Sequence, residues 1–176
     1  MEERVIAAGL ATDAELDAVL ASLYASASPV NGAQMVARAW TDSGYRARLL
    51  ADGNAGAAEL GFGGFSYRLK VVANAAGLHN MIVCTLCSCY PVSLLGPSPS
   101  WYKSLAYQSR AVRAPRAVLA EFGLGLPAGT EIAVWDATAE TRYLVLPCRP
   151  SGTKGLAEEK LASLVTRDGL IGTAAV

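Results

Sequence analysis

The chain has 176 residues, a length that suits one domain. Its 15 Lys and Arg residues balance its 15 Asp and Glu residues, and this zero net charge argues against a nucleic-acid-binding protein, which would carry a basic field. Apolar residues make up 52% of the sequence and charged residues only 17%, against about 25% in an average soluble domain, which excludes intrinsic disorder.

The mean hydropathy of +0.30 is high for a chain that stands alone in water. Apolar runs are interrupted well before the roughly 18 residues that a membrane span needs. Met1-Glu2-Glu3-Arg4 is not followed by an apolar run of the signal-peptide kind, so we expect a cytoplasmic protein that contacts no membrane. The apolar excess then indicates a subunit that buries part of its surface against a partner chain.

The first third of the chain has the periodicity of helices. Apolar residues recur at helical spacing over residues 3–25 with a break at Gly9, and Thr12 followed by Glu15 forms a capping-box pattern. We therefore expect two short helices there. Three further features are expected in this part: a linker at 26–29, a helix over 32–51 that Asn31 caps and Ser43-Gly44 interrupts, and a helical turn at 57–60.

From Gly61 onward, short β-type runs alternate with loops and helices. The runs Glu131–Trp135 and Thr141–Leu146 alternate in polarity around a short connection, which predicts an antiparallel strand pair. Together these segments predict a helical arm of about 55 residues followed by an α+β core. The other elements expected here are strands at 67–73 and 80–84, a loop at 97–100, a helix over 115–122 that Gly123 ends, and a last helix over 157–166.

Three of the four cysteines, Cys84, Cys87 and Cys89, are clustered in one short segment. A disulfide scaffold would spread its cysteines along a secreted chain, so this cluster indicates a metal or redox site. A structural zinc site would need His79 or Cys148 as fourth ligand, and a tetrahedral ion is poorly served by two thiolates from one tight turn. A redox Cys-x-x-Cys pair would not need the third cysteine.

The peptide nitrogens between Cys87 and Cys89 offer another geometry. If both sulfurs bind one ion, the nitrogens of Ser88 and Cys89 close fused chelate rings that favour a planar set of two nitrogens and two sulfurs. Cys84 then approaches from one side as an axial sulfur, and the sixth position stays open. Because peptide nitrogens bind only when deprotonated, this donor set suits a trivalent, low-spin ion better than Zn²⁺.

The segment Cys-Thr-Leu-Cys-Ser-Cys-Tyr-Pro resembles the metal-binding motif of the α subunit of nitrile hydratases. The resemblance extends over most of the chain, in many separate blocks. Those blocks are Asn31-Gly32, Arg48–Gly53, Glu59–Gly61, His79-Asn80, Trp101–Lys103, Ser109-Arg110, Val118–Gly123, Tyr143–Pro147 and Val165–Asp168.

This resemblance implies an enzyme that hydrates nitriles to amides on non-corrin cobalt or non-haem iron. Thr85 and Tyr90 stand where cobalt members usually have threonine and tyrosine, which favours cobalt(III) over iron(III). Cys84 would be the axial thiolate, and Ser88 and Cys89 would supply amide nitrogens. Cys87 would become a sulfinic acid and Cys89 a sulfenic acid, whose oxygen either attacks the nitrile or activates a water.

The resemblance also implies partners and a layered architecture. Residues 1–55 would form an N-terminal helical arm that wraps a partner subunit, and residues 56–176 a layered α-β-β-α catalytic core that binds the metal. One or two β-type chains would supply arginines to the oxidised cysteines, so this chain alone would be inactive. An activator protein would insert the cobalt.

Departures from the family pattern concern the expected substrate pocket. Val92-Ser93 stands where the family usually has Trp-Pro, which leaves a larger space beside the metal. Phe65 and Ser66 fall where the family has a Gln-Gly-Glu stretch, so a polar group of the pocket is lost or replaced. Val92, Phe65 and Ser66 therefore predict a substrate bulkier than a simple aliphatic nitrile, such as a heteroaromatic or nucleoside nitrile.

Two other functions remain open, the metal subunit of a thiocyanate hydrolase, which has the same cluster, and a metal-binding subunit without catalysis. For His79 we expect a structural hydrogen bond near the metal loop, and for Cys148 a free thiol. Arg110, Arg113 and Arg116, at steps of three, would share one helical side, where they contact a subunit, support the metal loop or face solvent.

Overall fold

The computed structural model of the protein describes residues 2–176, apart from the side chains of Glu2 and Leu23. The helices before the first strand are α1 (Glu2–Ala7), α2 (Asp13–Ala25), α3 (Pro29–Thr41), α4 (Ser43–Ala51) and α5 (Gly53–Ala58). After them come β1 (Arg68–Ala73), β2 (Leu78–Val83), α6 (Val92–Leu95), the 3-10 helix η1 (Ser100–Lys103), α7 (Leu105–Arg113), α8 (Pro115–Glu121), β3 (Glu131–Asp136), β4 (Thr141–Leu146), α9 (Glu158–Ala162) and α10 (Arg167–Ile171).

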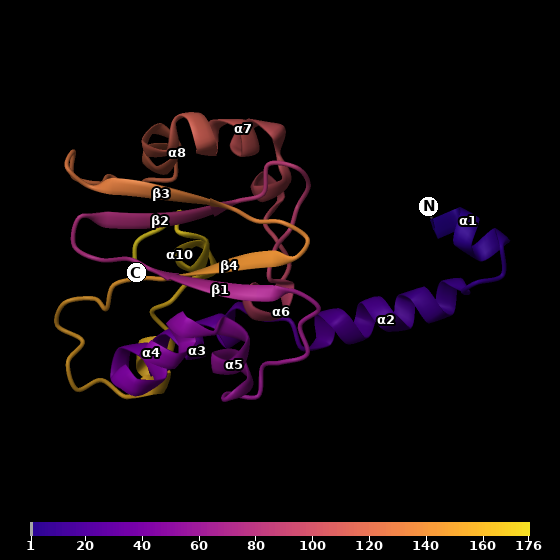
Figure 1. Cartoon of the computed structure of the whole chain (residues 1–176), viewed down its shortest axis with the longest axis horizontal. Helices are drawn as coiled ribbons and strands as arrows, with labels where there is room; N and C mark the ends of the chain where they lie inside the picture. The colour runs from indigo at the N-terminus through magenta and orange to yellow at the C-terminus, as the bar shows by residue number, and fades with distance from the viewer. Residues whose placement is uncertain (1) are drawn as a thin grey trace.

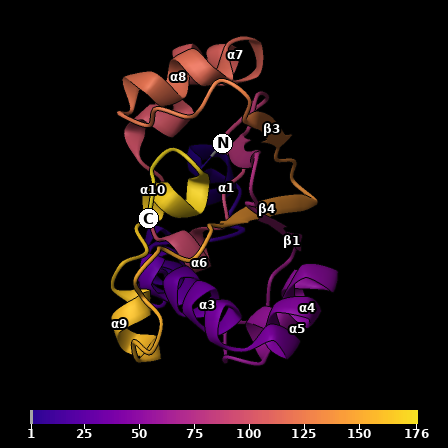
Figure 2. The same ribbon diagram turned by 90° about the vertical axis from the view of Figure 1, so that its left-hand side faces the viewer.

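Helices and strands are stacked in four layers, as Figure 1 shows. Helices α7 and α8 cover the outer side of the β2–β3 pair, and α3, α4 and α5 lie beyond the β1–β4 pair. Figure 2, turned by 90°, shows the same order. The expected α+β class with a layered α-β-β-α core is therefore confirmed. Apolar side chains from all the layers fill one core, among them Met35, Val36, Leu49, Met81, Ile82, Leu119, Leu144 and Val145.

Both strand pairs are parallel, β1 with β4 and β2 with β3. The antiparallel pairing expected for residues 131–135 and 141–146 is therefore wrong. Alternating polarity marks a half-buried strand but does not say which strand it pairs with. The short connection between β3 and β4 passes from one pair to the other, because the Ala137 N–H donates to the Val83 carbonyl and the Arg68 N–H to the Glu140 carbonyl, both at 2.7 Å.

Two short helices at the N-terminus project from the body (Figure 1). The capping box predicted between them is confirmed, since the Glu15 N–H donates to the Thr12 hydroxyl at 3.2 Å and the Thr12 N–H to the Glu15 carboxylate at 2.8 Å. Val19, Leu20 and Tyr24 of α2 are exposed. We name residues 2–25 the arm. The rest of the segment 1–55 does not project, since α3, α4 and α5 pack against the body.

No helix among residues 2–176 is long and apolar enough to span a bilayer.

Helix α3 begins earlier than expected, because Ser28, and not Asn31, is its N-cap. The Ser28 hydroxyl accepts from the Val30 N–H at 3.2 Å, and Pro29 occupies the first turn, where its missing N–H costs nothing. Asn31 lies inside that turn, and its side chain donates to carbonyls outside the helix. The break expected at Ser43-Gly44 is confirmed, with Asp42 capping α4.

The C-terminal helix expected over 157–166 is shorter and is followed by a second one. The first helix, α9, ends at Ala162, and Thr166 caps the start of α10, since its hydroxyl accepts from the Gly169 N–H at 3.1 Å. The three arginines also do not share a helical side. Because Pro115 disfavours helical backbone at the residue before it, the chain turns at Ala114, so Arg110 and Arg113 belong to α7 and Arg116 to α8.

Candidate metal centre

The three clustered cysteines lie in the loop that leaves β2, residues 84–91, which we name the metal loop. Their sulfur atoms all lie within 4.8 Å of one another. The Cys84 and Cys87 sulfurs are 3.4 Å apart and those of Cys87 and Cys89 3.2 Å apart. Cys84 and Cys89 are buried, whereas Cys87 is exposed. One ion can therefore reach all three sulfurs, and the cluster has a face that is open to the outside.

Residues from four other elements, β3, α7, η1 and β4, hold the metal loop along its length. Asp136, the last residue of β3, accepts the Thr85 N–H at 2.9 Å and the Thr85 hydroxyl at 2.5 Å. Gln108 of α7 donates to the Cys87 carbonyl at 2.6 Å. Two further bonds hold the later part of the loop, from Tyr102 to the Cys89 carbonyl at 3.1 Å and from Arg142 of β4 to the Tyr90 carbonyl at 2.6 Å.

The sulfurs differ in how easily they lose a proton. Hydrogen bonds from Cys89 and Cys84 lower the pKa of Cys87 to about 7, and the peptide N–H groups of Cys89 and Ser88 add to this effect. Burial raises the pKa of Cys89 to about 12, and its interaction with the Cys87 sulfur adds to this rise. The Cys87 N–H donates to the Cys84 sulfur at 3.4 Å, and the peptide nitrogens of Ser88 and Cys89 lie between the Cys87 and Cys89 sulfurs along the chain. The donor set thus fits a metal that takes thiolates and peptide nitrogens together.

A four-ligand zinc site does not fit this arrangement. Among the described residues the cluster comprises only the three cysteines. His79 is buried, with Nε2 at 2.7 Å from the Gly172 carbonyl oxygen and Nδ1 at 3.3 Å from the Asn74 side-chain nitrogen, so both of its ring nitrogens have partners. The structural hydrogen bond expected for His79 is confirmed, but its place near the metal loop is not, because His79 lies at the start of β2 and the loop leaves the other end of that strand. Cys148 is a free, exposed thiol, as expected.

Two of the three predicted pocket residues, Phe65 and Val92, are connected to the C-terminal end of the metal loop. Phe65 stacks on Tyr67, with ring centroids 5.1 Å apart, and the guanidinium carbon of Arg142 lies 4.6 Å from the centroid of the Tyr67 ring. Arg142 in turn holds the Tyr90 carbonyl. Val92, the first residue of α6, donates its N–H to that carbonyl at 2.9 Å and is half-buried, and Ser66 is exposed. The structure thus connects Phe65 and Val92 to the same end of the loop, and their contact with a substrate stays a prediction.

The known proteins that this chain resembles agree with a metal site at this loop. The sequence model of a family described as "Nitrile hydratase, alpha chain" matches residues 1–174. The chain belongs to this family. The α subunit of the low-molecular weight cobalt-containing nitrile hydratase of Rhodococcus rhodochrous is 48% identical over 173 residues, which cover 98% of this chain and 84% of that one. The resemblance to cobalt-type α subunits is therefore confirmed, and with it the expectation of an enzyme subunit.

Two other members of the comparison differ in metal or in reaction. A double mutant of the Fe-type nitrile hydratase from Comamonas testosteroni Ni1 superposes with a TM-score of 0.90 at 44% identity, covering 99% of this chain and 89% of the other. The thiocyanate hydrolase subunit gamma of Thiobacillus thioparus is 46% identical over 158 residues, or 83% of this chain and 65% of that one. The same scaffold is thus found with different metals and reactions.

The residues that hold the loop in this α chain were missed from the sequence. Asp136, Gln108, Tyr102 and Arg142 are distant from the cysteines in the chain, and each is of a common residue type. The sequence did contain a signal for Gln108. It is a polar residue on the apolar side of a helix, where it is buried and needs a hydrogen-bond partner. Asp136 reaches the loop because β3 pairs with β2, whereas the sequence analysis predicted that β3 pairs with β4.

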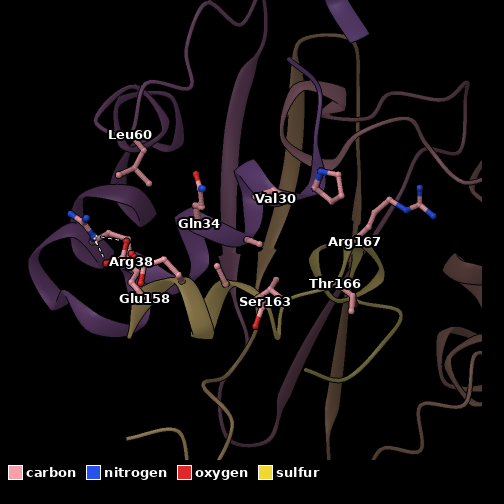
Figure 3. A pocket seen from close by; sticks show the side chains of 13 residues that line it. Val30, Gln34, Arg38, Leu60, Glu158, Ser163, Thr166 and Arg167 are labelled. Carbon is pink, nitrogen blue, oxygen red and sulfur yellow. Dashed lines mark hydrogen bonds and ion pairs between the residues drawn. The ribbon is translucent and has the colours of Figure 1, made fainter. Parts of the chain in front are cut away.

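A cavity of about 650 Å³ lies elsewhere, between α3 and the segment that contains α9 and the start of α10 (Figure 3). Val30, Gln34 and Ser163 line it, and the ion pair between Arg38 and Glu158, at 2.8 Å, lies at one end. Among the described residues, none of the three clustered cysteines lines this cavity. The cavity is therefore separate from the candidate metal centre.

Proposed function

We propose that the chain is the metal-bearing α subunit of a nitrile hydratase and hydrates a nitrile to the amide with cobalt(III). The observation that carries this proposal is the convergence of three sulfurs within 4.8 Å in a Cys-Thr-Leu-Cys-Ser-Cys loop, where the Cys87 N–H donates to the Cys84 sulfur. The relative from Rhodococcus rhodochrous with 48% identity, described as cobalt-containing, supports the choice of metal, as do Thr85 and Tyr90.

In this proposal Cys84, Cys87 and Cys89 give sulfur and Ser88 and Cys89 give peptide nitrogen to the metal. A trivalent ion held there would supply Lewis acidity toward the nitrile carbon. An external oxidant of the dioxygen or peroxide class would oxidise Cys87 to a sulfinic acid and Cys89 to a sulfenic acid, whose oxygen acts as the nucleophile or as a base toward water. The buried position of Cys89 keeps bulk solvent away from that oxygen, and Cys87 faces outward.

The partner would be one or two β-type chains that cover the metal loop and the arm. Leu86, Leu105 and Val112 are large apolar residues that are exposed around the loop, Leu86 at 88%. Thr85, Leu105, Gln108 and Val112 also line a hollow of about 460 Å³ at that face. Exposed apolar groups beside a catalytic loop mark a surface that another chain covers. That chain would supply arginines to the oxidised Cys87 and Cys89, and a separate activator protein would insert cobalt.

The substrate that we propose is a bulky heteroaromatic or nucleoside nitrile. Val92 is much smaller than the tryptophan usual in the family, and Phe65, stacked on Tyr67, offers a flat apolar wall close to the same loop end. Ser66, next to Phe65, is exposed and available to a polar part of the substrate. Toyocamycin, the nucleoside nitrile for which one family member is named, is the test substrate of choice.

The experiment is co-expression of this chain with its neighbouring genes in cobalt-containing medium. We expect a complex with about one cobalt per α chain, an intact mass of this chain raised by three oxygen atoms, and conversion of toyocamycin to its amide. A stoichiometric zinc content with unoxidised cysteines would contradict the cobalt proposal. Release of carbonyl sulfide and ammonia from thiocyanate, without amide formation, would favour the second candidate, a thiocyanate hydrolase subunit, which the 46% identity to the Thiobacillus thioparus protein supports.

A further inference from the structure

The side-chain amide of Asn31 joins two helices that are far apart in the sequence. Its Nδ2 donates to the Ser26 carbonyl and to the Ser93 carbonyl, each at 2.8 Å. Ser26 is the residue at which α2, the long helix of the arm, ends, and Ser93 lies in α6, directly after the metal loop. One amide group therefore connects the arm to the chain segment that follows the metal loop.

Neither the Ser26 carbonyl nor the Ser93 carbonyl accepts a hydrogen bond from its own helix. In α6 the Gly96 N–H takes the Val92 carbonyl, but the residue that would serve Ser93 is Pro97, which has no N–H. Ser26 is the C-terminal cap of α2, so its carbonyl lies beyond the helical ladder. A donor from elsewhere is needed at each position, and Asn31 has two N–H groups on a single nitrogen.

The start of α3 and α6 also pack too closely to move separately. A Cβ atom on Gly32 would lie 2.8 Å from the Leu94 carbonyl oxygen, so only glycine permits this approach. Gly96 has a φ of +70°, and a Cβ there would lie 2.9 Å from Pro29 Cδ. Helix α6 and the first turn of α3 thus form one rigid unit, and Asn31 attaches the arm to it.

We propose that Asn31 is a positioning residue that couples the arm to α6, so that binding of a partner chain to the arm fixes the position of Val92. Helix α6 begins at Val92, and the Val92 N–H donates to the Tyr90 carbonyl of the metal loop. Asn31 and the direct contact of α2 with α6 together connect the arm to the short helix that begins at the loop end. The importance of this coupling for substrate rests on the proposed function, but the coupling itself does not.

The test is hydrogen–deuterium exchange of the α6 amides of Leu94, Leu95 and Gly96, in the free chain and in the assembled complex. Asn31→Ala removes both donors. Ser28→Ala is the matched control, because it removes the N-cap of α3, between the arm and Asn31, and leaves both Asn31 bonds in place. We expect assembly to slow exchange at α6 in the unmodified chain and in Ser28→Ala. In assembled Asn31→Ala the same amides should exchange about fivefold or more faster than in the unmodified complex. Equal slowing in Asn31→Ala, or no slowing in the unmodified chain, would overturn the coupling.

A second variant keeps the test decisive if Asn31→Ala does not assemble. Val19→Ala combined with Leu20→Ala removes apolar surface from the exposed side of the arm and leaves Asn31 intact. With the partner's hold weakened, α6 should exchange faster although no residue of α6 is changed. Unchanged exchange there would refute the coupling. Neither readout depends on nitrile hydration, so absence of amide product would count against the proposed function alone. If the function holds as well, Asn31→Ala should raise KM for a bulky nitrile more than it lowers kcat.

Discussion

Thr85 and Asp136 are joined by two hydrogen bonds, one to each carboxylate oxygen. The Thr85 N–H donates at 2.9 Å and the hydroxyl at 2.5 Å. This pair ties the start of the metal loop to the end of β3. Its position follows from strand pairing, because Val83 lies opposite Asp136 in the register of β2 and β3. The carboxylate is therefore brought to the loop by the sheet and not by its neighbours in the chain.

Asp136→Asn should weaken the metal centre. An asparagine has one oxygen and one NH2 group in place of two acceptors, so one Thr85 donor loses its partner, and hydrogen bonds to charged groups contribute about 1.5–3 kcal/mol. We expect a loss of bound cobalt per complex and a parallel fall in kcat, measured by metal analysis and amide formation. Glu131→Gln, at the exposed start of the same strand, is the control and should retain its cobalt. Full cobalt occupancy in Asp136→Asn would show that the pair does not hold the loop.

Gln108 is expected to contribute to stability through the Cys87 carbonyl. Gln108→Leu keeps the volume of the side chain but removes the donor at 2.6 Å, which leaves the carbonyl without this bond at the centre of the metal loop. Loss of such a partner costs about 1–3 kcal/mol. Thermal unfolding of the assembled complex should shift downward by several degrees, whereas Ser109→Ala, at the next and exposed position, should leave the midpoint unchanged. Identical midpoints for the two variants would exclude this role of Gln108.

The cysteines of the site were predictable and their supports were not, for a physical reason. Cys84, Cys87 and Cys89 lie within six residues of the sequence, so the local chain alone brings their sulfurs together. Asp136 reaches the loop only through the parallel pairing of β2 and β3, which lie on either side of a helical crossover. An antiparallel pairing of β3 with β4, as alternation suggested, would have put Asp136 in a hairpin turn.

Local signals were reliable where the partners are near in sequence. The capping box of Thr12 and Glu15 was found because its two members are three residues apart. Asn31 was predicted to cap α3 because asparagine favours helix caps. Its side chain does bond to helix ends, but to the carbonyls at the ends of α2 and α6 and not to the start of α3. The choice between these ends depends on the packing of α3 against α6, which no local pattern encodes.

The capping box makes the helicity of the arm dependent on pH. Hydrogen bonds from the Thr12 backbone and hydroxyl lower the pKa of Glu15 below its ordinary value of 4.5. A carboxyl whose folded-state pKa is lowered contributes stability above its ordinary pKa and loses that contribution as pH falls through the lowered value. We expect the Glu15 amide of α2 to exchange faster, after correction for intrinsic rates, below about pH 4.5. In Glu15→Gln the corrected exchange should not change with pH over that range, and a pH response equal to that of the unmodified chain would contradict the assignment.

Arg142 should require its guanidinium and not only its charge. It donates to the Tyr90 carbonyl at 2.6 Å while its planar group lies over the Tyr67 ring, an arrangement that lysine cannot reproduce. Arg142→Lys should therefore lower both the stability of the complex and kcat/KM, with a cation–π share of about 0.5–2 kcal/mol. Denaturant unfolding and amide formation measure the two effects. Arg113→Lys, an exposed change on α7, is the control, and equal behaviour of the two variants would show that charge alone suffices.

Val92→Trp tests the substrate pocket directly. Val92 is the first residue of α6 and its N–H is bonded to the Tyr90 carbonyl, so an indole at this position would extend from a fixed backbone next to the loop end. A bulky nitrile should lose access first, so the ratio of kcat/KM for toyocamycin to that for acetonitrile should fall by about tenfold or more, a difference of about 1.4 kcal/mol between the two transition states. Val92→Ile is the matched control, because it adds one methylene and should change the ratio little. Equal losses on both substrates in Val92→Trp would mean that Val92 supports the fold and does not border the pocket.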